Sequence, residues 1–551
     1  MSYSGAIKGS KSTVVRLAAG RLDTYGDIDV KSIDNHGILG LNQILTGKSV
    51  TTDDFSNSAD AVLLTAMTRN GDVSSLTARQ SASLDGTWTI RPAEPDYYKN
   101  GEQITIKDNP VNGAAKVNGS FRSYSIETGS RTLKGTFDGT TVTFERDDDA
   151  YSGQTEHESN SGSEIPTSGE IAKSIDEIAG NASGDTTELI KALDFLPAGV
   201  SLNDALVSLS PEIYNYSAVN SLRDMSSVNT TVSRRMKAGF QGRGGLISGL
   251  SSDLTADLGG SAQKDPARSL KFYLQPYGGL LNRNGRHGNP DFDSRSGGVI
   301  GGGYLEGNDG FAFGAYAGFS ARYAKASGAM RSDINRGNGG FIGVNAILSP
   351  DEWNGAYLVS NISLGIYENH SKRKIAIPGF SRTAKADYTS YSYSAYAEAG
   401  YDYKTPFLTF GPLFSLEYSA DAHGSFSEKG AGGANLKVKS ETYDALKASA
   451  GAHLSHLIAS ADSLTVSGDL SALWRHDFLD GNYSGKASFK DAGGYSFEDK
   501  SGFDEKNVGI FSYSLKFARP KSGSSFNLAA IYETSGTYSA WDLNAYLDIR
   551  F

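Results

Sequence analysis

The chain has 551 residues, enough for two or three domains, a formal net charge of −10 and no cysteine. The negative charge provides no basic footprint for nucleic acid, and the missing cysteine excludes disulfides, thiolate metal sites and cysteine nucleophiles. The 65 glycines, 29 tyrosines and 25 phenylalanines favour β-architecture with tight turns over a helical bundle.

The N-terminus lacks the apolar core of a secretory signal, and no apolar run approaches the roughly 20 residues of a transmembrane helix. Two interpretations follow: a cytoplasmic protein, or a mature fragment without its leader. The C-terminal half favours the fragment.

Residues 1–150 are predicted to be β-rich and soluble in character. Short strands and glycine-containing turns alternate at frequent intervals over residues 85–149. If residues 85–149 close a β-solenoid, as the resemblance given below implies, one or two further coils of it precede Asp85.

Residues 151–210 are predicted to be a polar linker that becomes helical. The first part is rich in Gly and Ser, which is typical of a flexible segment. Ile171, Ile175 and Ile178 then follow at helical spacing.

Residues 211–240 are predicted to form one long helix. Ser210 is a good N-cap, Pro211 suits the first turn, and Glu212 places a carboxylate at the positive end of the helix dipole. The body is rich in Ser, Asn and Thr and only weakly amphipathic, so it would anchor poorly on a surface but suits a polar lumen. The roughly 27 residues that begin at Glu212 would span about 40 Å and so cross an apolar band of roughly 25 Å.

After a flexible connection over residues 241–268, the remaining residues 269–551 alternate apolar and polar side chains in about twelve segments. The apolar face is aromatic at its ends, like the girdles of an outer-membrane barrel. A soluble β-sandwich also alternates, but it rarely sustains strands of such length. The last strand places Trp541, Leu543, Leu547, Ile549 and Phe551 on its apolar face.

This half resembles the translocator barrel of the autotransporters, the type V secretion proteins of Gram-negative bacteria. The resemblance runs from KFYLQPYGGLLNR (271–283) through WRHDF (474–478) to the terminal Phe551. It implies a mostly β fold: a twelve-stranded antiparallel transmembrane β-barrel, preceded by a pore-spanning α-helix and a short right-handed β-helix that is the β-rich remnant of a passenger. It also implies that the apolar residues of the last strand are an insertion signal for the β-barrel assembly machinery.

The resemblance makes residues 211–240 a pore helix that plugs the barrel after secretion. Arg234, Arg235 and Lys237 near its end are then expected to make electrostatic contacts with inward carboxylates, for which the candidates are Glu398, Asp402 and Asp548. The alternative is a solvated charge run.

Some autotransporters cut themselves within this helix at an Asn. Asn229 is the candidate cleavage position here, but the paired Asn expected of that subclass is missing, so a polar pore-helix residue is the alternative. Residues 85–149 resemble the autochaperone cap of a passenger β-helix, in which Trp88 and Phe121 would shield the stacked core from water.

No catalytic constellation stands out. There is no G-x-S-x-G motif with plausible partners, and His453 and His456 lie three residues apart on a predicted strand, which is a poor chelate. We therefore expect no enzyme, no catalytic residue, no cofactor and no metal.

The predicted function is an outer-membrane translocator that inserts its barrel and moves or displays its own N-terminal passenger on the cell surface. The alternatives are a surface adhesin or binding module carried on the barrel, and a plugged outer-membrane channel. Expected partners are outer-membrane lipid, the assembly machinery and periplasmic chaperones, with a host surface as a candidate partner of the passenger and no nucleic acid.

Overall fold

The computed structural model divides the chain into two compact units. Unit 1 comprises Met1–Glu158, Ala172–Leu202 and Ile377–Phe380, and unit 2 comprises Ser159–Ile171, Asn203–Ala376 and Ser381–Phe551. The structure describes residues 2–9, 12–159, 166–240, 269–285, 290–307, 310–405, 408–461, 463–479, 482–490, 495–502, 506–519 and 524–548. The predicted flexible connection over 241–268 lies outside these residues, as do Ile549 and Phe551.

Unit 1 is built on two parallel sheets. One sheet has the strand order β1 (Ser2–Tyr3), β4 (Arg21–Thr24), β6 (Ile38–Leu41), β8 (Val62–Met67), β10 (Thr87–Pro92) and β14 (Ser123–Ile126). The other has the order β12 (Val111–Asn112), β9 (Leu76–Leu84), β7 (Val50–Asn57), β5 (Ile28–Asn35) and β2 (Ile7–Lys8), with β3 (Val14–Leu17) beside β5 and β13 (Lys116–Gly119) beside β9.

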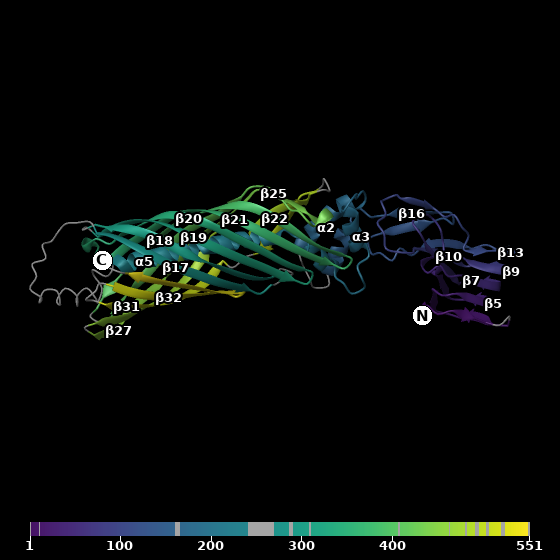
Figure 1. Cartoon of the computed structure of the whole chain (residues 1–551), viewed down its shortest axis with the longest axis horizontal. Helices are drawn as coiled ribbons and strands as arrows, with labels where there is room; N and C mark the ends of the chain where they lie inside the picture. The colour runs from purple at the N-terminus through teal and green to yellow at the C-terminus, as the bar shows by residue number, and fades with distance from the viewer. Residues whose placement is uncertain are drawn as a thin grey trace, which may run out of the picture. The chain divides into compact units, whose positions relative to one another are not determined.

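Successive strands from β4 to β10 pass back and forth between these two sheets, which is the path of a solenoid. Arg21 is paired with Ile38, Ile38 with Val62, and Val62 with Thr87. The stack therefore holds more coils than the one or two expected before residue 85. Figure 1 shows the flat layers of β5, β7 and β9.

The end of the solenoid is closed by aromatic packing. Trp88 and Phe121 are both buried, with their ring centroids 6.1 Å apart, and the ring of Phe137 stands edge-on to Trp88 at 4.9 Å. The indole N–H of Trp88 donates to Thr65 Oγ1 at 2.9 Å, so its one polar atom is satisfied inside the core. Phe137 belongs to a small antiparallel sheet of β11 (Gln103–Thr105), β16 (Thr141–Glu145) and β15 (Lys134–Phe137).

The segment after this sheet is helical earlier than the sequence suggested. It forms α1 (Ser152–Ser159), α2 (Pro166–Ala179), α3 (Thr186–Asp194) and α4 (Leu202–Val207), so the first part of the predicted flexible linker is a helix in the residues described. In unit 1, Arg146 forms an ion pair of 2.6 Å with Asp194, which also accepts the Tyr151 hydroxyl at 2.6 Å. These buried polar groups satisfy one another.

Unit 2 is a closed antiparallel barrel. Its sheet contains thirteen strands, of which β23 (Tyr403–Lys404) is a two-residue continuation after β22, and it closes where β17 pairs with β33 and β22 with β24. The prediction of a twelve-stranded antiparallel barrel is confirmed. The twelve strands are β17 (Ser269–Arg283), β18 (Asp291–Glu306), β19 (Phe311–Gly328), β20 (Arg331–Leu348), β21 (Ala356–Ile377), β22 (Phe380–Tyr401), β24 (Leu408–His423), β27 (Glu441–Ala461), β28 (Leu464–Asp477), β31 (Asn507–Arg519), β32 (Ser524–Thr534) and β33 (Tyr538–Asp548).

The barrel is apolar outside and polar inside. On β21, Ile362 and Leu364 are 56% and 57% exposed, whereas their neighbours Asn361 and Ser363 are each 1% exposed. A soluble protein buries the opposite set, so the exterior is suited to lipid. Among the helices described, none is long and apolar enough to cross a membrane.

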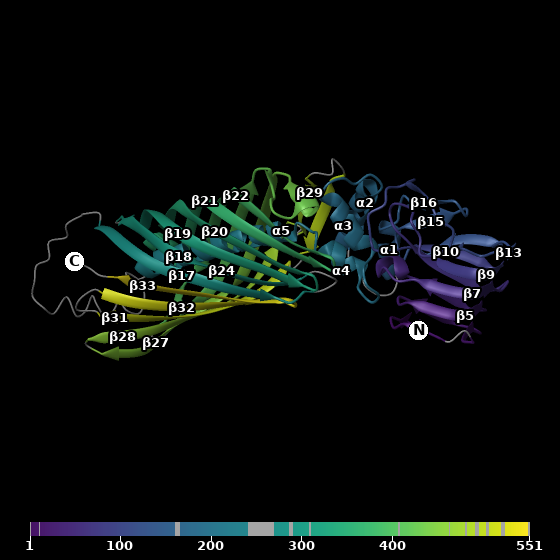
Figure 2. The same ribbon diagram turned by 45° about the vertical axis from the view of Figure 1, so that its right-hand side comes forward.

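Two segments between barrel strands form a further antiparallel sheet. Its order is β25 (Phe426–Ser427), β26 (Leu436–Val438), β29 (Asn482–Phe489) and β30 (Phe497–Gly502), and Figure 2 shows β29 at one end of the barrel. We call it the mouth sheet.

Candidate functional site

The helix α5 (Glu212–Phe240) lies inside the barrel (Figure 1). It contacts β17, β18, β19, β20, β24 and β27 of the wall and β29 and β30 of the mouth sheet. Nearly all its side chains up to Met236 are buried although the helix is rich in Ser, Asn and Thr. The barrel wall supplies polar partners to many of these side chains, although Asn229 Nδ2 and Ser233 Oγ have no hydrogen-bond partner among the described residues.

The first turn of α5 is fixed by a buried arginine from β20. Arg331 pairs with Glu212 at 2.7 Å and with Asp333 at 2.6 Å, and it also donates to Ser210 Oγ at 2.9 Å. The predicted helix start at Ser210 and Glu212 is therefore joined to the wall rather than exposed to water.

A second buried arginine links the wall to the mouth sheet. Arg373 of β21 pairs with Glu428 at 2.6 Å, and neither side chain is exposed. The hydroxyl of Tyr214 on α5 donates to the same Glu428 at 2.7 Å. One carboxylate therefore joins the helix, the wall and the connection between β25 and β26 of the mouth sheet.

The centre of the lumen holds an arginine and an aspartate that are almost wholly buried. Arg322 of β19 donates to Asp224 of α5 at 2.9 Å, and Asp224 also accepts the hydroxyls of Ser320 at 2.6 Å and Tyr277 at 3.2 Å. The guanidinium of Arg322 lies 3.3 Å from the ring centroid of Tyr367. Hydrogen bonds and a cation–π contact thus compensate the burial of this charge pair.

The closing strand β33 also contacts the helix. Arg223 pairs with Asp542 at 2.8 Å, and Ser227 donates to the same carboxylate at 2.9 Å. Its neighbour Trp541 faces outward and is 51% exposed. The strand therefore presents a carboxylate to the lumen and an aromatic ring to the exterior.

The three cations near the end of α5 have different surroundings. Lys237 forms an ion pair with Glu398. Arg235 is 1% exposed and lies over the rings of Tyr273, Tyr304 and Tyr546, at centroid distances of 5.3, 5.6 and 4.8 Å.

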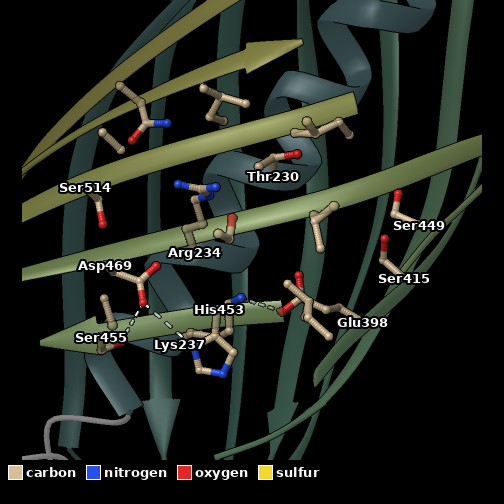
Figure 3. A pocket seen from close by; sticks show the side chains of 18 of the residues that line it. Thr230, Arg234, Lys237, Glu398, Ser415, Ser449, His453, Ser455, Asp469 and Ser514 are labelled. Carbon is tan, nitrogen blue, oxygen red and sulfur yellow. Dashed lines mark hydrogen bonds and ion pairs between the residues drawn. The ribbon is translucent and has the colours of Figure 1, made fainter. Parts of the chain in front are cut away.

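Arg234 instead lines a cavity of about 250 Å³ beside the helix (Figure 3). Of the other carboxylates considered for the cluster, Asp402 pairs with His453 at 3.1 Å. The side chain of Asp548 lies outside the described residues.

The cavity in Figure 3 lies between α5 and one side of the wall. His453 also lies 3.8 Å from Asp469, which accepts the Ser455 hydroxyl at 2.5 Å. His456 stacks on Tyr513 instead, with centroids 6.2 Å apart. Within the described ranges, no group of three or more His, Asp or Glu is placed to hold a metal ion.

Asn229 is buried in the middle of α5. Its side-chain oxygen accepts the amide of Asn361 at 2.7 Å and the hydroxyl of Ser394 at 3.1 Å. Both partners are neutral, so these contacts fit a polar pore-helix residue better than cleavage assisted by a carboxylate.

Three residues of the predicted insertion signal can be located. Trp541, Leu543 and Leu547 face outward and are 51%, 56% and 52% exposed. In unit 1, Trp88 and Phe121 lie together in the solenoid core, as described above.

Of the ion pairs that hold the helix to the wall, sequence reasoning had proposed Lys237 with Glu398 and none of the other three. The alternation of apolar and polar residues placed Arg322 and Asp542 on the polar face of their strands. This was the only sequence feature that could have marked them as partners of the helix. The partners come from residues 98 and 319 positions away along the chain, and no local pattern specifies such pairs.

Residues 272–529 match the family model described as Autotransporter beta-domain. Among solved structures, the chain is similar to the translocator domain of the autotransporter NalP from Neisseria meningitidis, with 16% identity, coverage of 58% of this chain and 98% of that chain, and a TM-score of 0.38. It is also similar to the β-domain of the Bordetella autotransporter BrkA (15% identity, 51% and 99% coverage, TM-score 0.38) and to the transport unit of AIDA-I from Escherichia coli (14%, 55% and 97%, TM-score 0.37). No curated protein sequence matches the chain significantly.

Proposed function

Residues 272–529 of this chain belong to the autotransporter β-domain family, and we propose that the chain moves its own N-terminal region to the cell surface and displays it there. The family places the barrel in the outer membrane as a translocator. The transported cargo is unit 1, which stays attached to the barrel after transport. The role is transport rather than catalysis.

The observation that carries this proposal is a set of ion pairs that hold α5 in the lumen. Each pair joins the helix, which links the barrel to unit 1 along the chain, to a barrel strand. The pairs are Glu212 with Arg331, Arg223 with Asp542, Asp224 with Arg322, and Lys237 with Glu398. Withdrawing the helix would leave its barrel partners without a countercharge, which favours a helix that stays in place.

A plugged channel is the alternative use of the same barrel. The cavity of about 250 Å³ beside α5 is consistent with it. An open lumen without ion pairs to the helix would favour a channel more strongly. The four ion pairs instead favour a helix that stays in the lumen once transport is complete. A binding role of unit 1 as an adhesin on a host surface is compatible with display.

For insertion, we propose that Trp541, Leu543 and Leu547, together with Ile549 and Phe551, form the signal that the β-barrel assembly machinery recognises. The three located residues support this because they form a continuous apolar face on β33, which also closes the barrel against β17. Periplasmic chaperones would keep this apolar surface from aggregating before insertion.

Cell fractionation with surface proteolysis tests the proposal. The chain is expressed behind a signal peptide, and external protease is added to intact cells. We expect an outer-membrane band with heat-modifiable mobility, and cleavage within residues 1–165 that leaves α5 and the barrel intact. Cleavage only after the cells are lysed would contradict display, and a soluble product without a heat shift would contradict the membrane barrel.

A further inference from the structure

Three cations surround one apolar residue on the outward face of the barrel wall. Lys325 of β19 and Lys372 of β21 are each paired across the sheet with Ile334 of β20, and Arg336 lies two residues further along β20. Neighbouring strands lie about 4.8 Å apart and alternate residues about 6.8 Å apart, so the three Cα atoms lie within roughly 10 Å of one another. We call these three residues the cationic patch.

The side chains of the patch point away from the lumen. Asp333 and Asn335, which alternate with Ile334 and Arg336, are 0% and 2% exposed and face the inside. Arg336 and Lys372 are exposed and Lys325 is half-buried. Within the described part of the chain, none of the three side chains has an ion-pair or hydrogen-bond partner, in contrast to the buried arginines of the lumen.

The patch lies just beyond the apolar exterior. The last apolar row contains Phe319 and Ile366, which are 51% and 57% exposed and are both paired with Gly340. Lys372 lies six residues beyond Ile366 on β21, which is about 20 Å along the strand and about 15 Å along the membrane normal for a strand tilted by roughly 40°. The headgroup layer of a leaflet is about 5–8 Å thick, so the backbone of the patch lies above this layer, and the long side chains of Arg336 and Lys372 can extend down to it.

The row through Lys325 carries no further cation toward β33, whereas the row through Arg336 continues by way of Tyr323 to the exposed Arg295 of β18. Following the sheet pairing toward β33, Lys325 is paired with Asp293, Asp293 with Asn282, and Asn282 with Ser539. No lysine or arginine lies in that part of the row. A local cluster of cations next to lipid is complementary to an anionic headgroup, and the aliphatic parts of the lysines can cover Ile334.

We propose that the cationic patch binds a phosphate group of an outer-leaflet glycolipid, whose acyl chains lie along the row of Phe319 and Ile366. The choice of leaflet rests on the proposed function, because it takes the end of the barrel at which α5 begins as the outer end. Arg331, at the start of β20, pairs with Glu212 at that same end. The phosphate would lie on the membrane side of Ile334, where the side chains of Lys325, Arg336 and Lys372 can converge on it.

The test measures binding of lipid A to the purified full chain in detergent, with its two phosphates present or enzymatically removed. The R336Q/K372Q variant removes two cations of the patch. We expect it to bind phosphorylated lipid A roughly 30-fold more weakly and to lose the preference for the phosphorylated form. The matched control K404Q/R519Q removes two exposed cations at the other end of the strands and should bind like the parent.

Equal affinity of the parent for both lipids, or unchanged affinity in R336Q/K372Q, would overturn the proposal. Displacement of the lipid by millimolar inorganic phosphate would also overturn it in favour of a soluble anion. Heat-modifiable mobility of each variant verifies that the barrel is folded. If surface proteolysis fails for the parent while the lipid preference persists, the display function is wrong and the patch still binds phosphate.

Discussion

Arg223 of α5 and Asp542 of β33 form an ion pair of 2.8 Å in which about a tenth of each side chain is exposed, 10% and 9% respectively. The pair joins the helix that fills the barrel to the strand that closes it. The filling of the barrel and its closure are thus linked through one contact, so we expect the stability of the barrel to depend on this helix.

Replacing Asp542 with Asn leaves the buried Arg223 without its countercharge. We expect D542N to lose about 3–5 kcal/mol of stability, because an unpaired buried charge is costly. The measurement is the temperature at which the folded barrel band converts to the unfolded band in a gel. The double variant R223M/D542L should recover most of the loss, since it leaves no charge behind. An unchanged transition temperature for D542N would show that water compensates Arg223.

Replacing Arg235 tests the contacts that its guanidinium makes with three tyrosine rings at the end of α5. Arg235→Lys keeps the charge but not the planar guanidinium that lies over Tyr273, Tyr304 and Tyr546. We expect R235K and R235L to lower the free energy that holds α5 in the lumen by roughly 2 kcal/mol. A less firmly bound helix should also raise the ion conductance of the barrel in planar bilayers. Arg234→Leu is the control, because Arg234 lines the cavity. If the conductance of R235K equals that of the parent, the positive charge alone is enough to hold the helix in the lumen.

Two adjacent positions on β33 test which face of the barrel meets lipid. Leu543 is 56% exposed on the outside, whereas Asn544 is 5% exposed and lines the lumen cavity. Leu543→Arg should cost about 2–4 kcal/mol near the membrane midplane and reduce the amount of inserted barrel. Asn544→Arg should be tolerated better, since it enters a polar space. The measurement is the heat-modifiable fraction in outer membranes, and equal effects of both substitutions would contradict a lipid-facing β33.

Alkaline pH should destabilise unit 1 through a buried tyrosine. Burial raises the pKa of Tyr98 to about 12. An unfolded tyrosine has a pKa of about 10, so the folded state holds this proton more tightly. The contribution to stability is complete below about pH 10 and is lost as the pH rises to about 12, which amounts to about 2.7 kcal/mol.

Tyr98→Phe removes the ionisable group and keeps the ring stacked on Phe144, where the centroids are 3.8 Å apart. We expect Y98F to resist protease at a higher pH than the parent when unit 1 is digested between pH 9 and pH 12. Tyr3→Phe, at a residue that is 37% exposed, is the control. Identical pH midpoints for Y98F and the parent would show that another group governs alkaline unfolding.

The sequence by itself determined the type of the long helix and of the barrel strands, and the face on which the residues of those strands lie. A two-residue period over the C-terminal half requires strands with one apolar face. An apolar face repeated about twelve times on long strands favours a closed barrel in lipid over a soluble β-sandwich. The Ser- and Asn-rich helix over 211–240 was predictable for a similar reason, because such a helix is stable only among polar partners.

Tertiary structure decided which residues pair. Alternation placed Asp542 in the lumen, but only the closure of β33 on β17 brings it to Arg223. Likewise, Arg235 was expected near carboxylates and lies among tyrosines contributed by three different strands, β17, β18 and β33. Local periodicity fixes the direction of a side chain. Its partner is fixed by strand register around the whole barrel and by the depth of the helix, which depend on contacts between residues far apart in the chain.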